Sequence, residues 1–277
     1  PSKISPEIKS YLGEDVQIKD AASLEKSLHN LNDKTILIDP ASTPLSLLHQ
    51  LETCHLLHSP DPCALPKAIK NPIEAEGARQ AHIQDGVAVT RFLAWLFTTA
   101  KTEDLNEVNA AEKLLSFRQQ SSLFTDTSFN TISGVGPNGA IVHYRATLES
   151  NRQFDQNTIY LVDSGGQYSN GTTDITRTVA IGTPTPEQKD RFTRVLKGHI
   201  AIASSLFPVG TTGSQLDPLA RHALWQVGLD YDHGTGHGVG SYLSVHEGPQ
   251  SISKRGADVP LKPGMILSNE PGYYKEG

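Results

Sequence analysis

The sequence has little cysteine: Cys54 and Cys63 are the only two among 277 residues. Two cysteines are too few for the disulfide framework of a small secreted domain. With two histidines they form the pattern C-H-x-x-H-x4-C, made by Cys54, His55, His58 and Cys63. Structural zinc sites usually pair their cysteines as C-x2-4-C, a spacing that is absent here. We therefore interpret both cysteines as free reduced thiols and keep a zinc site as the lesser alternative.

Long apolar runs and an excess of basic residues are also missing. The longest apolar stretch is far shorter than the roughly 20 residues that cross a bilayer, and no basic-then-apolar signal segment opens the chain. A net charge of −6 and a pI near 6.0 give no basic surface for nucleic acid. These absences predict a soluble, cytoplasmic protein with neither a nucleic-acid nor a membrane partner.

The only methionine is Met265. We therefore expect translation to begin upstream of Pro1, and we expect both ends of the sequence to be cut. A hydrophobic fraction of 37% with charges of both signs is normal for a globular chain of one large domain or two ordinary ones.

Prolines divide the chain in two. Residues 22–30 and 44–53 are helix candidates, and residues 35–39 (TILID) form a strand candidate between them, which suggests part of an α/β domain. The segment 59–66 (SPDPCALP) holds three prolines, which disfavour both helix and sheet. We predict a fragment of a preceding domain over residues 1–66 and a second domain over residues 67–277.

The second domain combines helices with hairpins. Asn71, Pro72 and Glu74 have capping-box spacing and predict a helix over residues 72–99. Further helices are predicted over 104–119, from a cap at Thr185, and over 217–228; strands are predicted over 129–134, 140–146, 158–165, 172–181 and 264–270. Turn sequences PNG and SNG are typical of hairpins. Helices grouped between hairpins favour an α+β fold, an antiparallel sheet covered by helices.

Two aspartates flank the second of these turns. Asp163 ends one predicted strand and Asp174 lies inside the next, so the hairpin can bring the two carboxylates together. Two close carboxylates need a cation between them, or one takes up a proton. Taken alone, Asp163 could open a turn and Asp174 could pair with Arg177. The other residues of the pattern shift the interpretation toward a metal site.

His237 and Glu270 complete the predicted ligand set. His237 lies in the glycine-rich segment GTGHGVG, where the backbone can approach a ligand closely, and Glu270 ends a predicted strand before Pro271-Gly272. Thiol-free ligation by oxygen and imidazole favours Mn(II) or Co(II), with Zn(II) possible. Two such ions can activate a water for attack on a carbonyl carbon.

Other histidines have natural tasks beside such a site. His143 and His246 are candidates to donate to an oxyanion or to a departing amine. His233 could line the substrate pocket or could make a purely structural hydrogen bond. A G-x-S-x-G elbow is absent and neither cysteine is near these segments, which leaves hydrolysis by activated water as the predicted reaction.

Several motifs resemble a known family. KNPIEAEGARQAHIQD, SFNTISGVGPNGAIVHY, DSGGQYSNGTTDITRT, LDYDHGTGHGVGSYLSVHEGP and NEPGYY are similar to those of the Xaa-Pro aminopeptidases (aminopeptidase P) of the three-domain type. The match covers about residues 66–277, and the first 65 residues resemble the tail of the family's preceding α/β domain, which is creatinase-N-like. The resemblance implies a pita-bread catalytic domain, two manganese ions per protomer, a homodimer, and removal of an N-terminal residue when proline is second.

The resemblance also implies roles for individual residues. Asp163 and Asp174 bind one ion, while Asp174, His237 and Glu270 reach the other or bridge the two. His143, His233 and His246 serve the substrate and the intermediate, and Glu270 also holds or relays a proton. The family pattern continues to a second ligating glutamate, which we expect beyond Gly277, so we expect this 277-residue chain to bind metal weakly or not at all.

Rival functions remain open within the same fold. Prolidase and methionine aminopeptidase are the close competitors, and a pita-bread module that binds peptides without cleaving them is the alternative of another class. The presence of all four ligand positions and three accessory histidines argues against the binding module.

Overall fold

The computed structural model describes residues 4–100, 104–256 and 258–276. By contacts the chain divides into two compact units, Pro1–Ala64 and Leu65–Gly277. Among the described residues, no helix combines the length and the apolarity that a membrane span requires.

The first unit is a small α/β arrangement. Its elements are α1 (Pro6–Leu12), the short 3-10 helix η1 (Ala21–Ser23), α2 (Leu24–His29), β1 (Thr35–Ile38), α3 (Leu45–His49) and β2 (His55–His58). β1 and β2 pair in parallel, from Thr35 opposite His55 to Ile38 opposite His58. The helices within 22–30 and 44–53 and the strand within 35–39 are confirmed, whereas β2 was missed because its HLLH sequence was interpreted only as possible metal ligands.

The second unit mixes long helices with short antiparallel pairings. Its elements in order are α4 (Ala64–Ala68), α5 (Pro72–Thr99), α6 (Glu107–Arg118), β3 (Phe124–Thr127), β4 (Ile132–Val135), η2 (Gly136–Ala140), β5 (Thr158–Ser164), β6 (Gly166–Tyr168), β7 (Gly171–Thr172), β8 (Ile175–Ile181), α7 (Pro186–Ala203), α8 (Gly213–Trp225), β9 (Gly236–His237) and β10 (Ser251–Ile252). The sheets have the orders β4-β5-β8, β3-β6-β7 and β10-β9. The predicted α+β class is confirmed.

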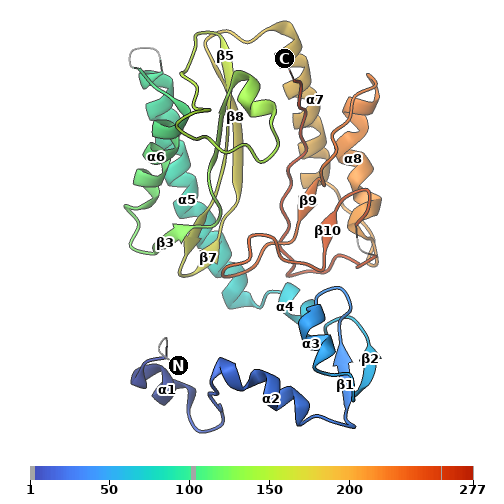
Figure 1. Ribbon diagram of the computed structural model, residues 1–277. Helices are drawn as coiled ribbons and strands as arrows, with labels where there is room; N and C mark the ends of the chain where they lie inside the picture. Colours follow the sequence, from blue (N-terminus) through green and yellow to red (C-terminus); the bar gives the residue numbers. More distant parts are fainter. Residues whose placement is uncertain (1–3, 101–103, 257, 277) are drawn as a thin grey trace. The chain divides into compact units, whose positions relative to one another are not determined.

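Helices of the second unit flank its central strands. In Figure 1, α5 and α6 lie together on one side of β5 and β8, and α7 and α8 pack together on the other. The core between the first helix pair and the strands contains Phe92, Leu96, Leu114, Tyr160 and Val162, each at most 2% exposed. Burial of these large side chains stabilises the sheet β4-β5-β8, in which β5 carries Asp163.

The start of α5 follows from its sequence. Asn71 Oδ1 accepts hydrogen bonds from the backbone N–H groups of Ile73 and Glu74, and Glu74 Oε2 accepts one from the Asn71 N–H. Three otherwise unpaired N–H donors are thereby satisfied, so the helix begins at Pro72 as predicted and runs to Thr99.

α8 begins four residues earlier than predicted. Thr212 and Gln215 form a capping box, with the Thr212 N–H donating to Gln215 Oε1, so the helix begins at Gly213. Pro218 lies inside the helix and does not begin it. The Asp217-Pro218 pair was therefore the wrong start signal.

Of the two predicted hairpin turns, the structure contains one. The SNG turn is confirmed, with Tyr168 opposite Gly171, but it joins the short strands β6 and β7, whereas the sequence predicted that it joins 158–165 to 172–181 directly. The PNG turn lies inside η2, and the described residues 141–146 after it form no strand, so both predictions are wrong. The reason is tertiary, because Tyr144 turns inward and donates its hydroxyl to the buried carboxylate of Glu107 at 2.8 Å.

The predicted strand over 264–270 is also wrong. In the described part of this segment only an isolated bridge occurs, between Gly238 and Leu267. The backbone nevertheless runs beside β9, since the Ser268 N–H donates to the His237 carbonyl oxygen and the Glu270 N–H to that of Thr235, both at 2.8 Å. These two bonds place Glu270 next to His237.

Candidate metal centre

Strand pairing brings Asp163 and Asp174 close together. β5 pairs with β8 so that Ser164 lies opposite Ile175, one residue beyond each aspartate. Asp174 therefore lies immediately before β8, not inside the strand as predicted. The β6–β7 hairpin fills the intervening sequence, so the chain leaves the pairing after Ser164 and returns to it at Ile175.

His237 meets two carboxylates from separate segments. Its Nε2 lies 3.2 Å from Asp174 Oδ2 and 3.2 Å from Glu270 Oε1. The ligand atoms of the three residues lie within 4.8 Å of one another, and the described residues contain no other such group of histidine, cysteine and acidic side chains. Cys54, His55, His58 and Cys63 therefore form no such cluster, and both cysteines are free.

The orientation of the His237 ring suits a metal ligand. Its Nδ1 lies 2.9 Å from the carbonyl oxygen of Gly238, which can only accept a hydrogen bond. The proton is therefore assigned to Nδ1, and in the neutral ring Nε2 presents its lone pair to Asp174 and Glu270. Ser268 orients the third member, because its hydroxyl donates to Glu270 Oε1 at 2.7 Å.

Charge is concentrated at this cluster. Burial, followed by the charge of Asp174, raises the pKa of Asp163 to about 7. Although burial by itself lowers the pKa of His237, its hydrogen bonds to Asp174 and Glu270 raise it to about 10. Burial likewise opposes ionisation of Glu270, but hydrogen bonds from His237 and Ser268 lower its pKa overall. In the metal-free protein, the positive charge of the His237 imidazolium compensates the carboxylates in place of a metal ion.

The residues present fit a divalent ion. Among the described side chains, Asp163 Oδ1 is a buried oxygen that accepts no hydrogen bond. A buried carboxylate oxygen without a donor is unfavourable, and a cation removes that cost. Asp163 lies outside the group of Asp174, His237 and Glu270, but it is near enough for their charges to shift its pKa. The four side chains together offer oxygen and imidazole donors, which suit Mn(II), Co(II) or Zn(II).

Glycines around His237 permit close packing of the backbone. A Cβ atom at Gly236 would overlap the carbonyl oxygen of Ser268, and one at Gly238 would overlap that of Glu247. The sequence predicted a close approach of this segment to a ligand. In the structure the neighbours that require glycine are the adjoining backbone segments.

The accessory histidines differ in their surroundings. The rings of His246 and His237 lie 4.2 Å apart at 73°. Burial, followed by the charge of His237, lowers the pKa of His246, and His143 contributes in the same direction. His143 is exposed and has a left-handed backbone (φ 58°). His246 therefore adjoins the cluster, and His143 is near enough to influence its charge.

His233 makes the structural contacts that the sequence left open. Its Nδ1 lies 2.8 Å from the carbonyl oxygen of Gly234, and its Nε2 lies 3.0 Å from the hydroxyl of Tyr274. It also lies near enough to Glu270 for its charge to lower the pKa of that carboxyl. Tyr274 was missed by the sequence reasoning, although it belongs to the NEPGYY motif.

A buried ion pair supports the segment that carries His233 and His237. Arg221 Nε donates to Asp217 Oδ2 at 2.6 Å, and both side chains are at most 2% exposed. Arg221 also donates to the His233 carbonyl oxygen at 2.8 Å, and the Thr235 hydroxyl donates to Asp217 Oδ1 at 2.6 Å. Sequence reasoning missed this pair, which its i, i+4 spacing on a helix could have suggested.

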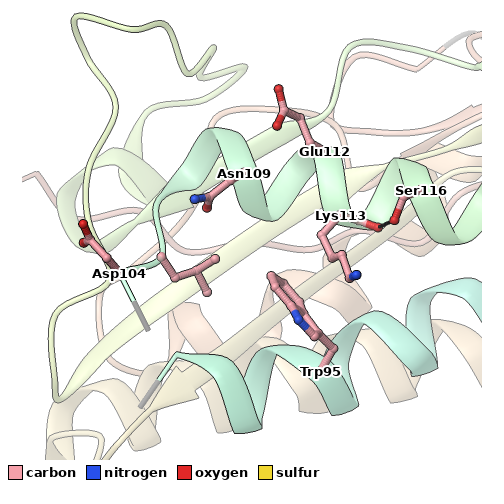
Figure 2. A pocket seen from close by; sticks show the side chains of 7 residues that line it. Trp95, Asp104, Asn109, Glu112, Lys113 and Ser116 are labelled. Atoms are coloured by element: carbon pink, nitrogen blue, oxygen red, sulfur yellow. Dashed lines mark hydrogen bonds between the residues drawn. The ribbon is translucent and has the colours of Figure 1, made fainter. Parts of the chain in front are cut away.

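A separate hollow lies between α5 and α6. Its volume is about 330 Å³, and Figure 2 shows the residues that line it: Trp95, Asp104, Leu105, Asn109, Glu112, Lys113 and Ser116. None of them belongs to the cluster around His237. The Lys113 ammonium lies 5.6 Å from the Trp95 ring centroid. The Lys113 side chain therefore already covers the face of the Trp95 ring, which is the aromatic ring of this hollow.

Comparison with known proteins decides the family. Residues 76–277 match metallopeptidase family M24, and residues 1–74 match the Creatinase/Prolidase N-terminal domain. The chain belongs to metallopeptidase family M24. The resemblance to Xaa-Pro aminopeptidases, the pita-bread fold and the creatinase-type N-terminal unit predicted from the motifs are confirmed.

Two of the most similar relatives are both described as probable Xaa-Pro aminopeptidases P. The chain is 47% identical over 290 residues to a probable Xaa-Pro aminopeptidase P of Aspergillus clavatus, covering 99% of this chain and 44% of that protein. It is 51% identical over 259 residues to a probable Xaa-Pro aminopeptidase P of Laccaria bicolor, covering 92% and 40%. The chain thus spans less than half the length of these relatives.

Solved M24 structures agree with the fold. The X-prolyl aminopeptidase of Caenorhabditis elegans, described as a cytosolic enzyme with a di-nuclear active site, has a TM-score of 0.93 at 35% identity, covering 99% of this chain and 46% of that chain. A prolidase of Pyrococcus furiosus has a TM-score of 0.80 at 24% identity, which supports the fold alone.

Proposed function

We propose that the whole protein is a metal-dependent aminopeptidase that removes the N-terminal residue from peptides with proline in the second position. The observation that carries this proposal is the convergence of the ligand atoms of Asp174, His237 and Glu270 within 4.8 Å of one another. The unpaired carboxylate oxygen of Asp163, whose pKa responds to the charges of these three residues, supports it. The probable Xaa-Pro aminopeptidases P among the relatives and the di-nuclear site of the Caenorhabditis elegans enzyme support the same reaction.

The proposed cofactor is a pair of Mn(II) ions, for which Co(II) or Zn(II) could substitute. Asp163 and Asp174 would hold one ion, and Asp174, His237 and Glu270 would reach the other or bridge both. When bound, the ions supply Lewis acidity and a water activated for attack on a carbonyl carbon.

The side chains around this site would move and place protons. The Glu270 carboxylate, whose pKa is lowered, is ionised near neutral pH and can accept a proton at an Oε atom. His246, whose pKa is lowered by burial, is neutral there and can donate one N–H to the developing oxyanion. His143 and His233 are proposed to bind the substrate, with the Tyr274 hydroxyl holding the His233 ring.

The remaining proposals concern the whole molecule. We infer that residues 1–66 are part of a preceding domain and that residues 67–277 form the metallopeptidase domain. The contact division after Ala64 and the N-terminal-domain match over residues 1–74 support this boundary. We also propose a cytoplasmic homodimer with a peptide as its partner and with no binding to nucleic acid or membrane. The cytosolic description of the Caenorhabditis elegans relative supports that location.

A cleavage assay on the whole protein tests the proposal. Mn(II)-loaded protein is offered Arg-Pro-Pro-type tripeptides, Xaa-Pro dipeptides and Met-Ala peptides in parallel. Preferential release of the first residue from the tripeptides, abolished by Asp174→Ala, is the expected result. Preferential dipeptide cleavage would identify a prolidase, and preference for Met-Ala peptides would identify a methionine aminopeptidase. Peptide binding without turnover, at less than one ion per protomer, would identify a non-catalytic module.

A further inference from the structure

Asp85 is a buried charge on an otherwise apolar helix face. It lies on α5 between Ala81 and Ala88, both at most 5% exposed, and is itself 0% exposed. Burial of a carboxylate is costly unless donors surround it. We therefore expect the Asp85 carboxylate to have a function in the core that an apolar side chain of similar size could not have.

Three side chains donate to the Asp85 carboxylate. Arg118 Nε donates to Oδ1 at 2.6 Å and its Nη2 to Oδ2 at 3.1 Å. The Tyr168 hydroxyl donates to Oδ1 at 3.0 Å, and the Thr173 hydroxyl donates to Oδ2 at 2.5 Å. Arg118 is 1% exposed and Thr173 and Tyr168 are 0% exposed, so this network is shielded from solvent.

The network ends beside both aspartates of the metal centre. Thr173 directly precedes Asp174, while Ser164, which directly follows Asp163, accepts a hydrogen bond from Arg118 Nη2 at 3.0 Å. One buried acid thus holds the residue next to each candidate ligand, although the two ligands lie on different sides of a hairpin.

The backbone between these two points is also fixed. The Gly166 N–H donates to Thr173 Oγ1 at 2.8 Å, and the Thr173 N–H donates to the Gly166 carbonyl oxygen at 2.9 Å. The Ser128 hydroxyl donates to the Thr173 carbonyl oxygen at 2.8 Å, and a Cβ atom at Gly165 would overlap that same oxygen. Thr173 therefore uses its hydroxyl, N–H and carbonyl together, which leaves its neighbour Asp174 little freedom.

We propose that Asp85 is a positioning residue of the metal centre, which sets the place of Asp174 through the Thr173 hydroxyl and that of Asp163 through Arg118 and Ser164. Asp85 makes none of its hydrogen bonds to the candidate ligands themselves and acts through their chain neighbours. This inference rests on the proposed function for the presence of ions, but the arrangement exists in the metal-free protein. Groups that hydrogen-bond directly to metal ligands typically change metal affinity by about 10-fold to 100-fold, and because Asp85 acts through the neighbours of the ligands we expect the lower end of this range.

The decisive variants alter Thr173. Thr173→Val keeps the branched shape but removes the hydroxyl that joins Asp85 to the ligand segment, and Thr173→Ser restores a hydroxyl. Tyr160→Phe is the matched control, because Tyr160 is 0% exposed, lies on β5 as Asp163 does, and bonds through its hydroxyl to Ser133 Oγ at 2.8 Å. The control loses a buried hydrogen bond of the same strand without touching the Asp85 network.

The measurements are made on the whole protein. Calorimetric titration with Mn(II) gives the dissociation constant, visible absorption of the Co(II)-loaded protein reports the ligand geometry, and thermal unfolding of the metal-free protein reports the stability of the fold. We expect Thr173→Val to weaken Mn(II) binding about 10-fold or more and to alter the Co(II) spectrum. Thr173→Ser should stay near the wild type, and Tyr160→Phe should lower the Tm while leaving affinity and spectrum unchanged.

Each other outcome contradicts a specific statement. If Thr173→Val binds Mn(II) as the wild type does, or if Tyr160→Phe weakens binding equally, Asp85 supports only the fold and the positioning role is wrong. If the wild-type whole protein binds no ion, the proposed function itself fails and the positioning role fails with it. Binding by the wild type therefore separates the two failures.

Discussion

His237 Nε2 lies 3.2 Å from Asp174 Oδ2, although His237 lies in β9 and Asp174 lies immediately before β8. The contact joins the β5–β8 part of the structure to the β9–β10 part. The group of Asp174, His237 and Glu270 forms only when both parts are in place. The relative placement of these strands is therefore the structural condition for metal binding.

Ion binding is expected to stabilise the whole protein through this contact. Because an ion binds only the folded arrangement, Mn(II) at about 100 times its dissociation constant should add about 2.7 kcal/mol to the free energy of unfolding. Thermal unfolding with and without Mn(II) measures this shift. His237→Ala should abolish it, whereas His222→Ala, at an exposed position of α8, should retain it. An equal shift in both variants would place the ion elsewhere.

Metal binding should also release protons. In the metal-free protein the pKa of His237 is raised to about 10 and that of Asp163 to about 7. At pH 7 His237 is protonated and Asp163 about half protonated, and both must be deprotonated to ligate an ion, so roughly one to two protons should leave. Affinity should accordingly fall as the pH is lowered.

Calorimetry in buffers of different ionisation enthalpy counts these protons. Asp163→Asn should reduce the count and His237→Gln should reduce it further. A heat of binding that is independent of the buffer would contradict the charge arrangement of the cluster.

The buried pair of Asp217 and Arg221 should be important for folding. Arg221→Met leaves the Asp217 carboxylate without its cation in a position 1% exposed, which should lower the free energy of unfolding by about 3–5 kcal/mol. Urea unfolding of the whole protein measures the difference. Arg79→Met, which breaks an exposed pair with Glu76, is the control and should cost less than about 1 kcal/mol. Similar losses in the two variants would show that burial does not decide the effect.

Acid should destabilise the fold at Asp230, whose carboxylate pairs with Arg221 of α8 and with Lys254. Although burial by itself raises the pKa of Asp230, hydrogen bonds from Lys254 and Arg221 lower it overall. A carboxyl whose pKa is depressed in the folded state stabilises that state above its unfolded pKa of about 4. This stability is lost as the pH falls toward the folded pKa.

Lys254→Met removes one of the two cations. The variant should be less stable than the wild type at pH 7, and the difference should shrink as the pH approaches 2. Thermal unfolding across that range tests the statement. A difference that grows toward low pH would contradict it.

Local signals in the sequence were sufficient for several elements. The capping box at Asn71 determined where α5 begins, and the SNG turn determined the β6–β7 hairpin. Asp163, Asp174, His237 and Glu270 were predicted as ligands because glycines and turn residues surround residue types that bind metals. These features depend on neighbours in the sequence, which periodicity and motif spacing can detect.

Features that depend on distant contacts were not predicted. Residues 140–146 alternate like a strand, yet the buried carboxylate of Glu107 captures the Tyr144 hydroxyl and the chain turns. Asp85 was missed because its partners Arg118, Tyr168 and Thr173 are far from it in sequence. A charged residue on the apolar face of the predicted 72–99 helix was the one available signal.

The most direct test of the account is the location of the ions themselves. Crystals of the whole protein grown with Mn(II) are measured at the manganese absorption edge, and the anomalous peaks are placed on the chain. We expect two peaks, with side-chain atoms of Asp163, Asp174, His237 and Glu270 as direct ligands and with His237 binding through Nε2. Peaks held by other residues, or crystals of active protein without a peak between these four side chains, would contradict it.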